Sequence, residues 1–223
     1  MFMKWDAIFN PDLAIKALPT ILSGLPYTLS LSLIGFFLGT ICGFFIALMK
    51  LSRWRILRTL AHIHISFMRG TPLMVLLFLI YYGLPFAGIQ FDAITASIIA
   101  FTMMSSAYLS EIIRSSLQAI QKGQWDAAYS LGLNKPIIYR KIIIPQATRI
   151  ALPPLSNVLL DMVKSTSLTA MITVPDMFNQ AKIVGGSHSD YMTVYIVVAC
   201  LYWVICTTYA IAQGYLESRL NTY

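Results

Sequence analysis

Charged residues are scarce in this sequence, and their scarcity excludes most water-soluble folds. Asp, Glu, Lys and Arg make up 11% of the 223 residues, whereas hydrophobic residues make up 57% and the mean hydropathy is +0.70. A chain with so few polar residues cannot cover a soluble core of this size. A lipid bilayer is therefore the expected solvent.

Cysteine and histidine are also scarce, which argues against a metal site, a disulfide framework and a membrane enzyme. The three cysteines, Cys42, Cys200 and Cys206, fall inside apolar runs, where packing is their usual role. His62 and His64 have no acidic or cysteine neighbour at metal-ligand spacing, so we expect them to be polar residues near the membrane interface. The sequence has no Gly-x-x-x-x-Gly-Lys-Ser/Thr segment and hence no P-loop of its own.

Long uncharged runs predict an all-α membrane protein with about five transmembrane helices, because crossing the hydrocarbon takes about 20 apolar residues. Three uncharged runs, 17–49, 93–110 and 191–216, approach or exceed this length and predict spans over about 21–49, 93–113 and 191–216. Two further spans must include charge. One is expected over 60–82 and carries Arg69, and the other is expected to start at Pro153-Pro154 and run over 153–174. Residues 1–223 would form a single transmembrane domain.

The positions of the basic residues predict the orientation of these spans. They cluster after the first span, at 50–58, and after the third, at 114–149. By the positive-inside rule these segments are cytoplasmic, which places the N-terminus outside and the C-terminus, with Arg219, inside. This distribution explains the net charge of +7 without a nucleic acid partner. Within the first span, Gly35, Gly39 and Gly43 share a helix face that allows close packing within or between subunits.

The cytoplasmic segment 115–149 has the composition of two short helices and not of a loop. Good helix formers fill 115–133 with a break at Gly123, a turn is expected at Asn134-Lys135-Pro136, and an apolar pattern resumes from Ile137 until Pro145. A structured hairpin of this length on a chain with few loops indicates a functional element.

This hairpin contains Asp126-Ala127-Ala128, three intervening residues, Gly132, nine intervening residues, and then Ile142-Ile143-Ile144-Pro145. The pattern resembles the EAA motif of ATP-binding-cassette (ABC) importer permeases, Glu-Ala-Ala, three residues, Gly, nine residues, Ile-x-Leu-Pro. This sequence departs from the pattern at two positions, with Asp126 in place of Glu and Ile144 in place of Leu. Four other segments resemble the polar amino acid branch of that family, the HisM/GlnP-like permeases: Lys122 to Trp125, Arg69 to Pro72, Ala107 to Arg114, and Lys164 to Leu168.

The resemblance covers about residues 20 to 215 and implies a bacterial inner-membrane permease with a coupling helix that docks on a separate ABC ATPase. ATP and Mg²⁺ would then act on that ATPase, and no cofactor would bind this chain. A second permease subunit, identical or not, an extracytoplasmic solute-binding protein and an amino-acid substrate are the other implied partners. The expected coupling residues are Asp126, Ala127, Ala128, Gly132 and Pro145.

Ionisable residues within spans are costly, and they are the first candidates for a substrate path. In the fourth predicted span, one helix face carries Asn157, Asp161, Lys164 and Ser165. The alternative to a substrate or gate lining is an internal Asp161–Lys164 pair at i, i+3, and both alternatives stay open. For Arg69 and Glu111 we favour a structural ion pair between the second and third spans over a place on the path.

The resemblance also bears on the substrate. Permeases of this family that carry cations tend to have acidic residues where this chain has Val158 and Ser165, so a neutral or zwitterionic amino acid, similar to glutamine or cystine, is favoured over a basic one. Asp161 counts against that inference. The alternative is an ion-coupled secondary transporter or channel, which fits five spans but leaves 126–145 unexplained. A membrane scaffold is disfavoured by the charges within spans.

Overall fold

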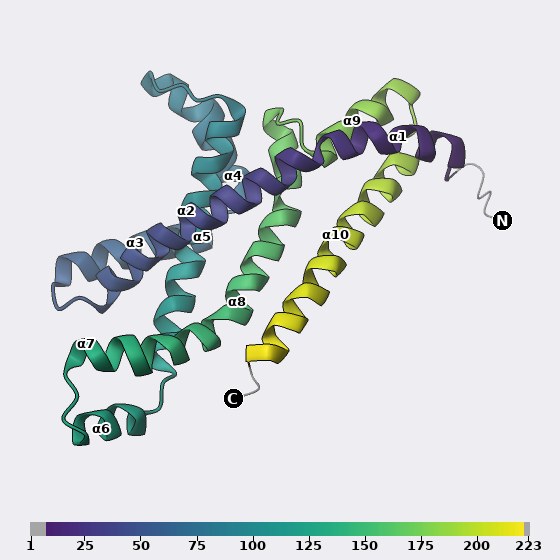
Figure 1. The fold of residues 1–223 in the computed structure, drawn as a ribbon. Coiled ribbons are helices and arrows are strands. Elements are labelled where there is room, and N and C mark those ends of the chain that lie inside the picture. The colour runs from purple at the N-terminus through teal and green to yellow at the C-terminus, as the bar shows by residue number, and fades with distance from the viewer. Residues whose placement is uncertain (1–7, 221–223) are drawn as a thin grey trace, which may run out of the picture. The chain divides into compact units, whose positions relative to one another are not determined.

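The computed structural model describes residues 8–220, with side chains up to Ser218, and this part of the chain is helical without any strand. The all-α prediction is confirmed. Figure 1 shows the ten α-helices. They are α1 (Pro11–Ser23), α2 (Leu25–Leu51), α3 (Arg55–Gly70), α4 (Leu73–Phe78), α5 (Ala93–Gln118), α6 (Lys122–Ser130), α7 (Lys135–Ile138), α8 (Ile144–Ser165), α9 (Met177–His188) and α10 (Tyr191–Leu220).

The chain divides into two compact units. The first consists of Met1–Gly35, Pro72–Phe101 and Leu160–Ala210, and the second of Phe36–Thr71, Thr102–Leu159 and Ile211–Tyr223. Helices α2, α5, α8 and α10 each contribute residues to both units. The predicted coupling segment, 115–149, lies entirely in the second unit.

Among the described residues, three helical segments are long and apolar enough to cross a membrane: Pro11–Leu51, Ala93–Gln118 and Tyr191–Ser218. A fourth qualifies if Arg55–Gly70 and Leu73–Ala87 count together as one broken span. A continuous helix over 60–82 is therefore wrong. Pro72 has no N–H to donate and forces the preceding Thr71 into an extended conformation (φ −106°, ψ 131°), which ends α3 at Gly70.

The fourth predicted span also begins elsewhere than expected. Helix α8 starts at Ile144 and contains Pro153 and Pro154 in its interior, so a start at the proline pair is wrong. The buried side chains of Ala147 and Ala151 show why the preceding turns stay helical, since they pack into the second unit. The far end agrees with the prediction, because a 3-10 segment, Thr166–Ile172, continues α8 until Thr173 takes a left-handed conformation at φ 66°.

The core of the first unit joins α1, α9 and the start of α10, and Figure 1 shows α1 beside α9. Asp176 caps α9, with one carboxylate oxygen accepting from the Asn179 N–H at 2.9 Å and the other from the Tyr202 hydroxyl at 3.4 Å. Asp176 lies outside the predicted spans, and its complete burial raises the pKa of the carboxyl to about 6. Gly24 at the end of α1 allows the backbone of Asp176 to approach closely.

The glycine face of α2 packs against α5 within the chain. In the first unit Gly35 contacts the side chain of Phe101. In the second unit Gly39 lies on Ser105, and a Cβ on Gly43 would meet the Ser106 carbonyl oxygen at 3.0 Å. The three glycines are buried, so this face serves packing within the chain.

We predict that Gly43→Ala destabilises the protein by about 1–3 kcal/mol, because the added methyl group would lie 3.0 Å from the Ser106 carbonyl oxygen and the Ser110 nitrogen, backbone atoms of α5 that would have to shift. Gly214→Ala is the matched control, since Gly214 lies in α10 with open space around it and alanine favours a helix by about 1 kcal/mol. Thermal unfolding in detergent measures both. Equal behaviour of the two variants would contradict the close contact of α2 with α5.

Candidate functional site

The predicted coupling hairpin consists of α6, a tight turn, and the helical stretch formed by α7 and a π-helix, Tyr139–Ile143, which leads into α8. Gly132 occupies the turn at φ 67°, a conformation that favours glycine, and the N–H of Leu133 donates to the Ala128 carbonyl at 3.2 Å. The prediction that Gly132 ends this helix is confirmed.

Two local details of the hairpin differ from the sequence-based expectation. The break lies at 119–121, and Gly123 belongs to the first turn of α6, so a break at Gly123 is wrong. Asn134 begins α7 instead of forming a turn, because its side chain accepts a hydrogen bond from the Ile137 N–H at 3.2 Å and caps the helix. Pro136 then occupies the first turn, where its missing N–H costs nothing.

Ala128 is buried in the apolar core of the hairpin. It is 1% exposed and packs with apolar side chains from both arms, namely Ile120, Ile138, Ile143 and Ala147. Trp125 packs edge to face against Tyr139, with ring centroids 5.3 Å apart. The close-approach role predicted for Ala128 is therefore internal to this chain. A larger side chain there would separate the two arms of the hairpin.

The outer face of α6 carries two other residues of the motif, Asp126 and Ala127. Asp126 and Ala127 are exposed, as are Tyr129, Ser130 and Leu131, whose side chain is 77% exposed. Pro145 is exposed in the first turn of α8. Since a short helix with small and apolar side chains on its open face fits a groove on a partner protein, this face of α6 is the candidate docking surface.

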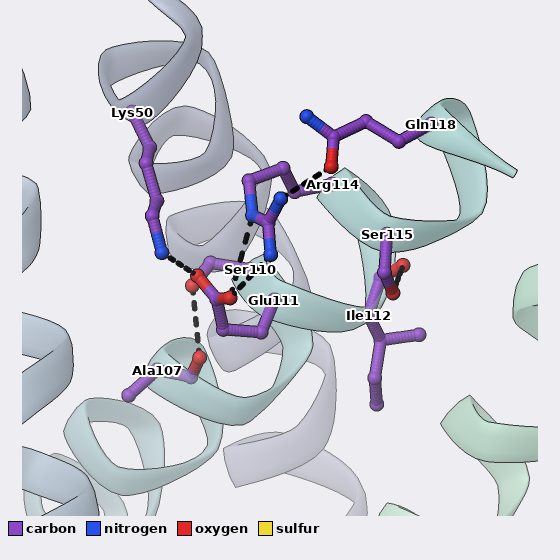
Figure 2. Close-up of polar contacts among 8 residues, drawn as sticks. All are labelled: Lys50, Ala107, Ser110, Glu111, Ile112, Arg114, Ser115 and Gln118. Carbon is purple, nitrogen blue, oxygen red and sulfur yellow. Dashed lines mark hydrogen bonds and ion pairs between the residues drawn. The ribbon is translucent and has the colours of Figure 1, made fainter.

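An ion-pair network joins α2 to the end of α5, as Figure 2 shows. Lys50 donates to one carboxylate oxygen of Glu111 at 2.5 Å, and Arg114 donates to the other at 2.8 Å. Arg114 also donates to the side chain of Gln118, in the last turn of α5 before the hairpin, at 2.5 Å. The network therefore connects the end of α2 with the residues that lead into α6.

This network contradicts the pairing favoured from the sequence, Arg69 with Glu111. Glu111 lies opposite the last turn of α2, where Lys50 reaches it, and the Arg69 guanidinium lies 5.6 Å from the ring centroid of Tyr108 in a cation–π contact. The sequence-based prediction did not identify Lys50 as the partner of Glu111. Its position as the first charged residue after the uncharged run 17–49 was a signal that could have indicated it. His64, expected to be a polar residue near the membrane interface, contacts the Ser106 hydroxyl at 2.9 Å, and this contact joins α3 to α5.

The polar residues of α8 remain accessible. Asp161 and Lys164 form an ion pair at 2.7 Å, with side chains that are 71% and 53% exposed. Asn157 is exposed and lies 3.5 Å from the side-chain nitrogen of Gln213, and Ser165 is half-buried. The i, i+3 pair considered from the sequence is thus formed, but its exposure leaves both charges free to meet another molecule.

Comparisons with known proteins agree with these features. The family model for the binding-protein-dependent transport system inner membrane component matches residues 39–222. The protein YckA of Bacillus subtilis (strain 168), named a probable amino-acid ABC transporter permease, is 49% identical over 99% of this chain and 98% of its own length. The L-cystine transport system permease protein TcyB of the same organism is 37% identical over 92% of this chain and 88% of its own length.

Solved structures give the same answer for the fold. The crystal structure of an amino acid ABC transporter with histidines has a chain that matches with a TM-score of 0.88 at 38% identity, covering 92% of this chain and 96% of that one. An inward-facing structure of the MetNI methionine ABC transporter matches with a TM-score of 0.74 at 18% identity over 91% of this chain and 96% of that one, and this shows the fold alone. By the family model and the extent of these likenesses, the chain belongs to the binding-protein-dependent transport system inner membrane components, which are transport subunits of ABC importers and not enzymes.

Proposed function

We propose that this chain moves a polar amino acid across the bacterial inner membrane by alternating access, with the energy supplied by ATP hydrolysis on a separate subunit. The family membership already makes it an ABC importer permease for amino acids. The observation that supports the mechanism is the hairpin, in which Ala128 belongs to a buried apolar core while the outer face of α6 is exposed to a partner.

The importer family implies an ATPase, a second permease and a solute-binding protein as partners. On our proposal ATP and Mg²⁺ act on the ATPase, whose closure draws the two coupling helices together and turns the permease pair toward the outside. A ligand drives such a switch only by binding one state better than the other, which nucleotide and the loaded binding protein both supply. An ion-coupled carrier or channel would give the exposed face of α6 no role.

For the topology we propose five crossings, with the N-terminus outside and the C-terminus in the cytoplasm. The hairpin then lies in the cytoplasm, where the ATPase is. Helix α8 and its 3-10 continuation form the fourth crossing, and α3 with α4 form the broken second crossing. The positive-inside distribution of lysine and arginine supports this orientation.

For the substrate path we propose the exposed face of α8, with Asn157, Asp161, Lys164 and Ser165. A zwitterionic amino acid carries one charge to exchange with each member of the Asp161–Lys164 pair. Arg69 remains a path candidate because it is exposed. Glu111 is assigned to the structural network with Lys50 and Arg114 and leaves the set of path residues.

A neutral or zwitterionic substrate, similar to glutamine or cystine, is favoured over a basic one. The name of one relative supports this choice, since TcyB is an L-cystine permease. Another Bacillus subtilis relative, GlnM, is named a probable glutamine permease and is 35% identical over 90% of this chain and 93% of its own length.

The direct test reconstitutes this chain in liposomes with its ATPase, its second permease subunit and its binding protein. We expect ATP hydrolysis to rise when the binding protein carries glutamine or cystine and to stay at the basal level when arginine is offered. Stimulation by arginine alone would overturn the substrate class. Absence of stimulation by every amino acid would overturn the assignment as an amino-acid importer.

We predict that Ala127→Trp lowers stimulated ATP hydrolysis about tenfold, because a large side chain on the outer face of α6 blocks docking while the hairpin core stays intact. Ala87→Trp, at an exposed alanine of the first unit, is the matched control and should leave stimulation unchanged. Ala128→Trp should instead lower the yield of folded protein. If Ala127→Trp transports normally, α6 is not the docking surface.

We predict that Asp161→Asn and Lys164→Met each lower uptake about tenfold while basal ATP hydrolysis persists, since each removes one charge offered to the substrate. The double variant Asp161→Lys with Lys164→Asp distinguishes a role in binding the substrate from a purely structural ion pair. It restores an internal ion pair but reverses the charges that the substrate meets. Recovery of uptake in the exchanged pair would assign the two residues a structural role only.

A further inference from the structure

The second unit contains an apolar groove of about 640 Å³ between α2, α5 and α8. One wall is the segment of α2 from Thr40 to Leu48, and the opposite wall is the segment of α8 from Ile144 to Leu155. Leu117 and its neighbours on α5, together with Tyr139, contribute the remaining lining. This volume lies within the range of about 300–1,000 Å³ typical of ligand pockets.

The groove offers almost nothing to a polar ligand. Two of its hydroxyl groups are already used by their own helices, because Thr40 donates to the Phe36 carbonyl and Thr148 to the Ile144 carbonyl, each at 2.8 Å. The side chains of Phe44 and Phe45 are exposed beside them. An amino acid bound here would lose its hydration without compensating hydrogen bonds, so a hydrocarbon is the fitting occupant.

The groove also lies on a different side of α8 from the polar residues. Ile144, Ala151 and Leu155 share one face, whereas Asn157 and Asp161 project from the other side, because two helical residues advance the direction by about 200° from Leu155 to Asn157. If the polar face meets the substrate and the second permease subunit, the groove faces away from them and toward lipid.

The length and the mouth of the groove fit one phospholipid tail. From Ile144 to Leu155 the helix rises about 16 Å, which is close to half of the roughly 30 Å hydrocarbon thickness. At the Ile144 end the groove is lined by Tyr139, and the next two residues, Arg140 and Lys141, are exposed cations. An aromatic ring followed by basic side chains is typical of the level at which lipid phosphates lie.

We propose that this groove binds an anionic glycerophospholipid, with an acyl chain along α2 and α8 and the phosphate at Arg140 and Lys141. The lipid-facing side of the groove rests on the proposed substrate path, and the assignment to the cytoplasmic leaflet rests on the proposed orientation. The bound chain would contact Ala147 and Leu117, which also pack with Ala128 in the hairpin core. Lipid in this groove therefore supports the same apolar cluster that holds the coupling helix in place.

The test incorporates the full chain in phosphatidylcholine nanodiscs containing a small fraction of phosphatidylglycerol with a photoreactive group on its acyl chain. Peptide mass spectrometry then locates the crosslinks. We expect them within 40–48 and 144–155, well above the level found on the exposed part of α10. The same probe with a phosphatidylcholine headgroup should label this groove about tenfold less, given the contribution of each basic residue near a membrane surface.

Two variants with matched controls complete the experiment. Thr148→Trp fills the groove and should abolish groove labelling, while Thr208→Trp should not, because Thr208 is an exposed threonine of α10 whose hydroxyl makes the same bond to its own helix. Arg140→Gln with Lys141→Gln should remove the preference for phosphatidylglycerol, and Arg55→Gln with Arg58→Gln should keep it.

Three results would overturn the proposal. Labelling spread evenly over all apolar helices would mean ordinary solvation by lipid, and equal labelling by both headgroups would remove the anionic site. Disulfide formation between two copies carrying Phe45→Cys, in the absence of groove labelling, would show that a second copy of this chain covers the groove. None of these results affects the assignment as a permease.

Discussion

The close packing of α2 against α5 is the contact on which the arrangement of the second unit depends. Only glycine at positions 39 and 43 lets the two helix backbones approach as they do. Two turns beyond Gly43, the same approach brings Lys50 to Glu111, and Arg114 and Gln118 extend that link to the end of α5. The last turns of α5, which precede the predicted coupling hairpin, are thus linked to α2 through Lys50. The same two helices, with α8, enclose the apolar groove.

Neighbouring residues of the motif lie on opposite sides of α6, one buried in the hairpin and the other exposed. Ala128 faces inward and lets α6 lie against the stretch from α7 to α8, while Ala127 and Asp126 face outward. On the proposed function, the outward face docks on the ATPase, and the apolar cluster around Ala128 holds that face in place. Gly132 allows the tight reversal between the two arms. In the motif, adjacent alanines therefore have different physical roles.

Much of this architecture could be predicted from local sequence properties. Uncharged runs marked the helices of α2, α5 and α10, because crossing hydrocarbon requires length and apolarity. The motif spacing marked the hairpin, and Gly132 marked its turn. The predictions failed where residues distant in sequence determine the local structure or the pairing. Tertiary packing keeps α8 helical through two prolines, and the partner of Glu111 depended on which helix lies opposite it. The proline at position 72 carried a clear signal for a break, but the length required of a span outweighed it.

The proline pair inside α8 has a mechanical consequence. A helical N–H normally bonds to the carbonyl four residues earlier, so Pro153 and Pro154 leave the carbonyls of Arg149 and Ile150 without those two bonds. Because these two hydrogen bonds are already missing, bending the helix here does not break them. The turns before this point pack into the coupling hairpin, and the turns after it carry Asp161 and Lys164. Helix α8 therefore has a point at which it can bend, between the turns that pack into the hairpin and the turns that carry the Asp161–Lys164 ion pair.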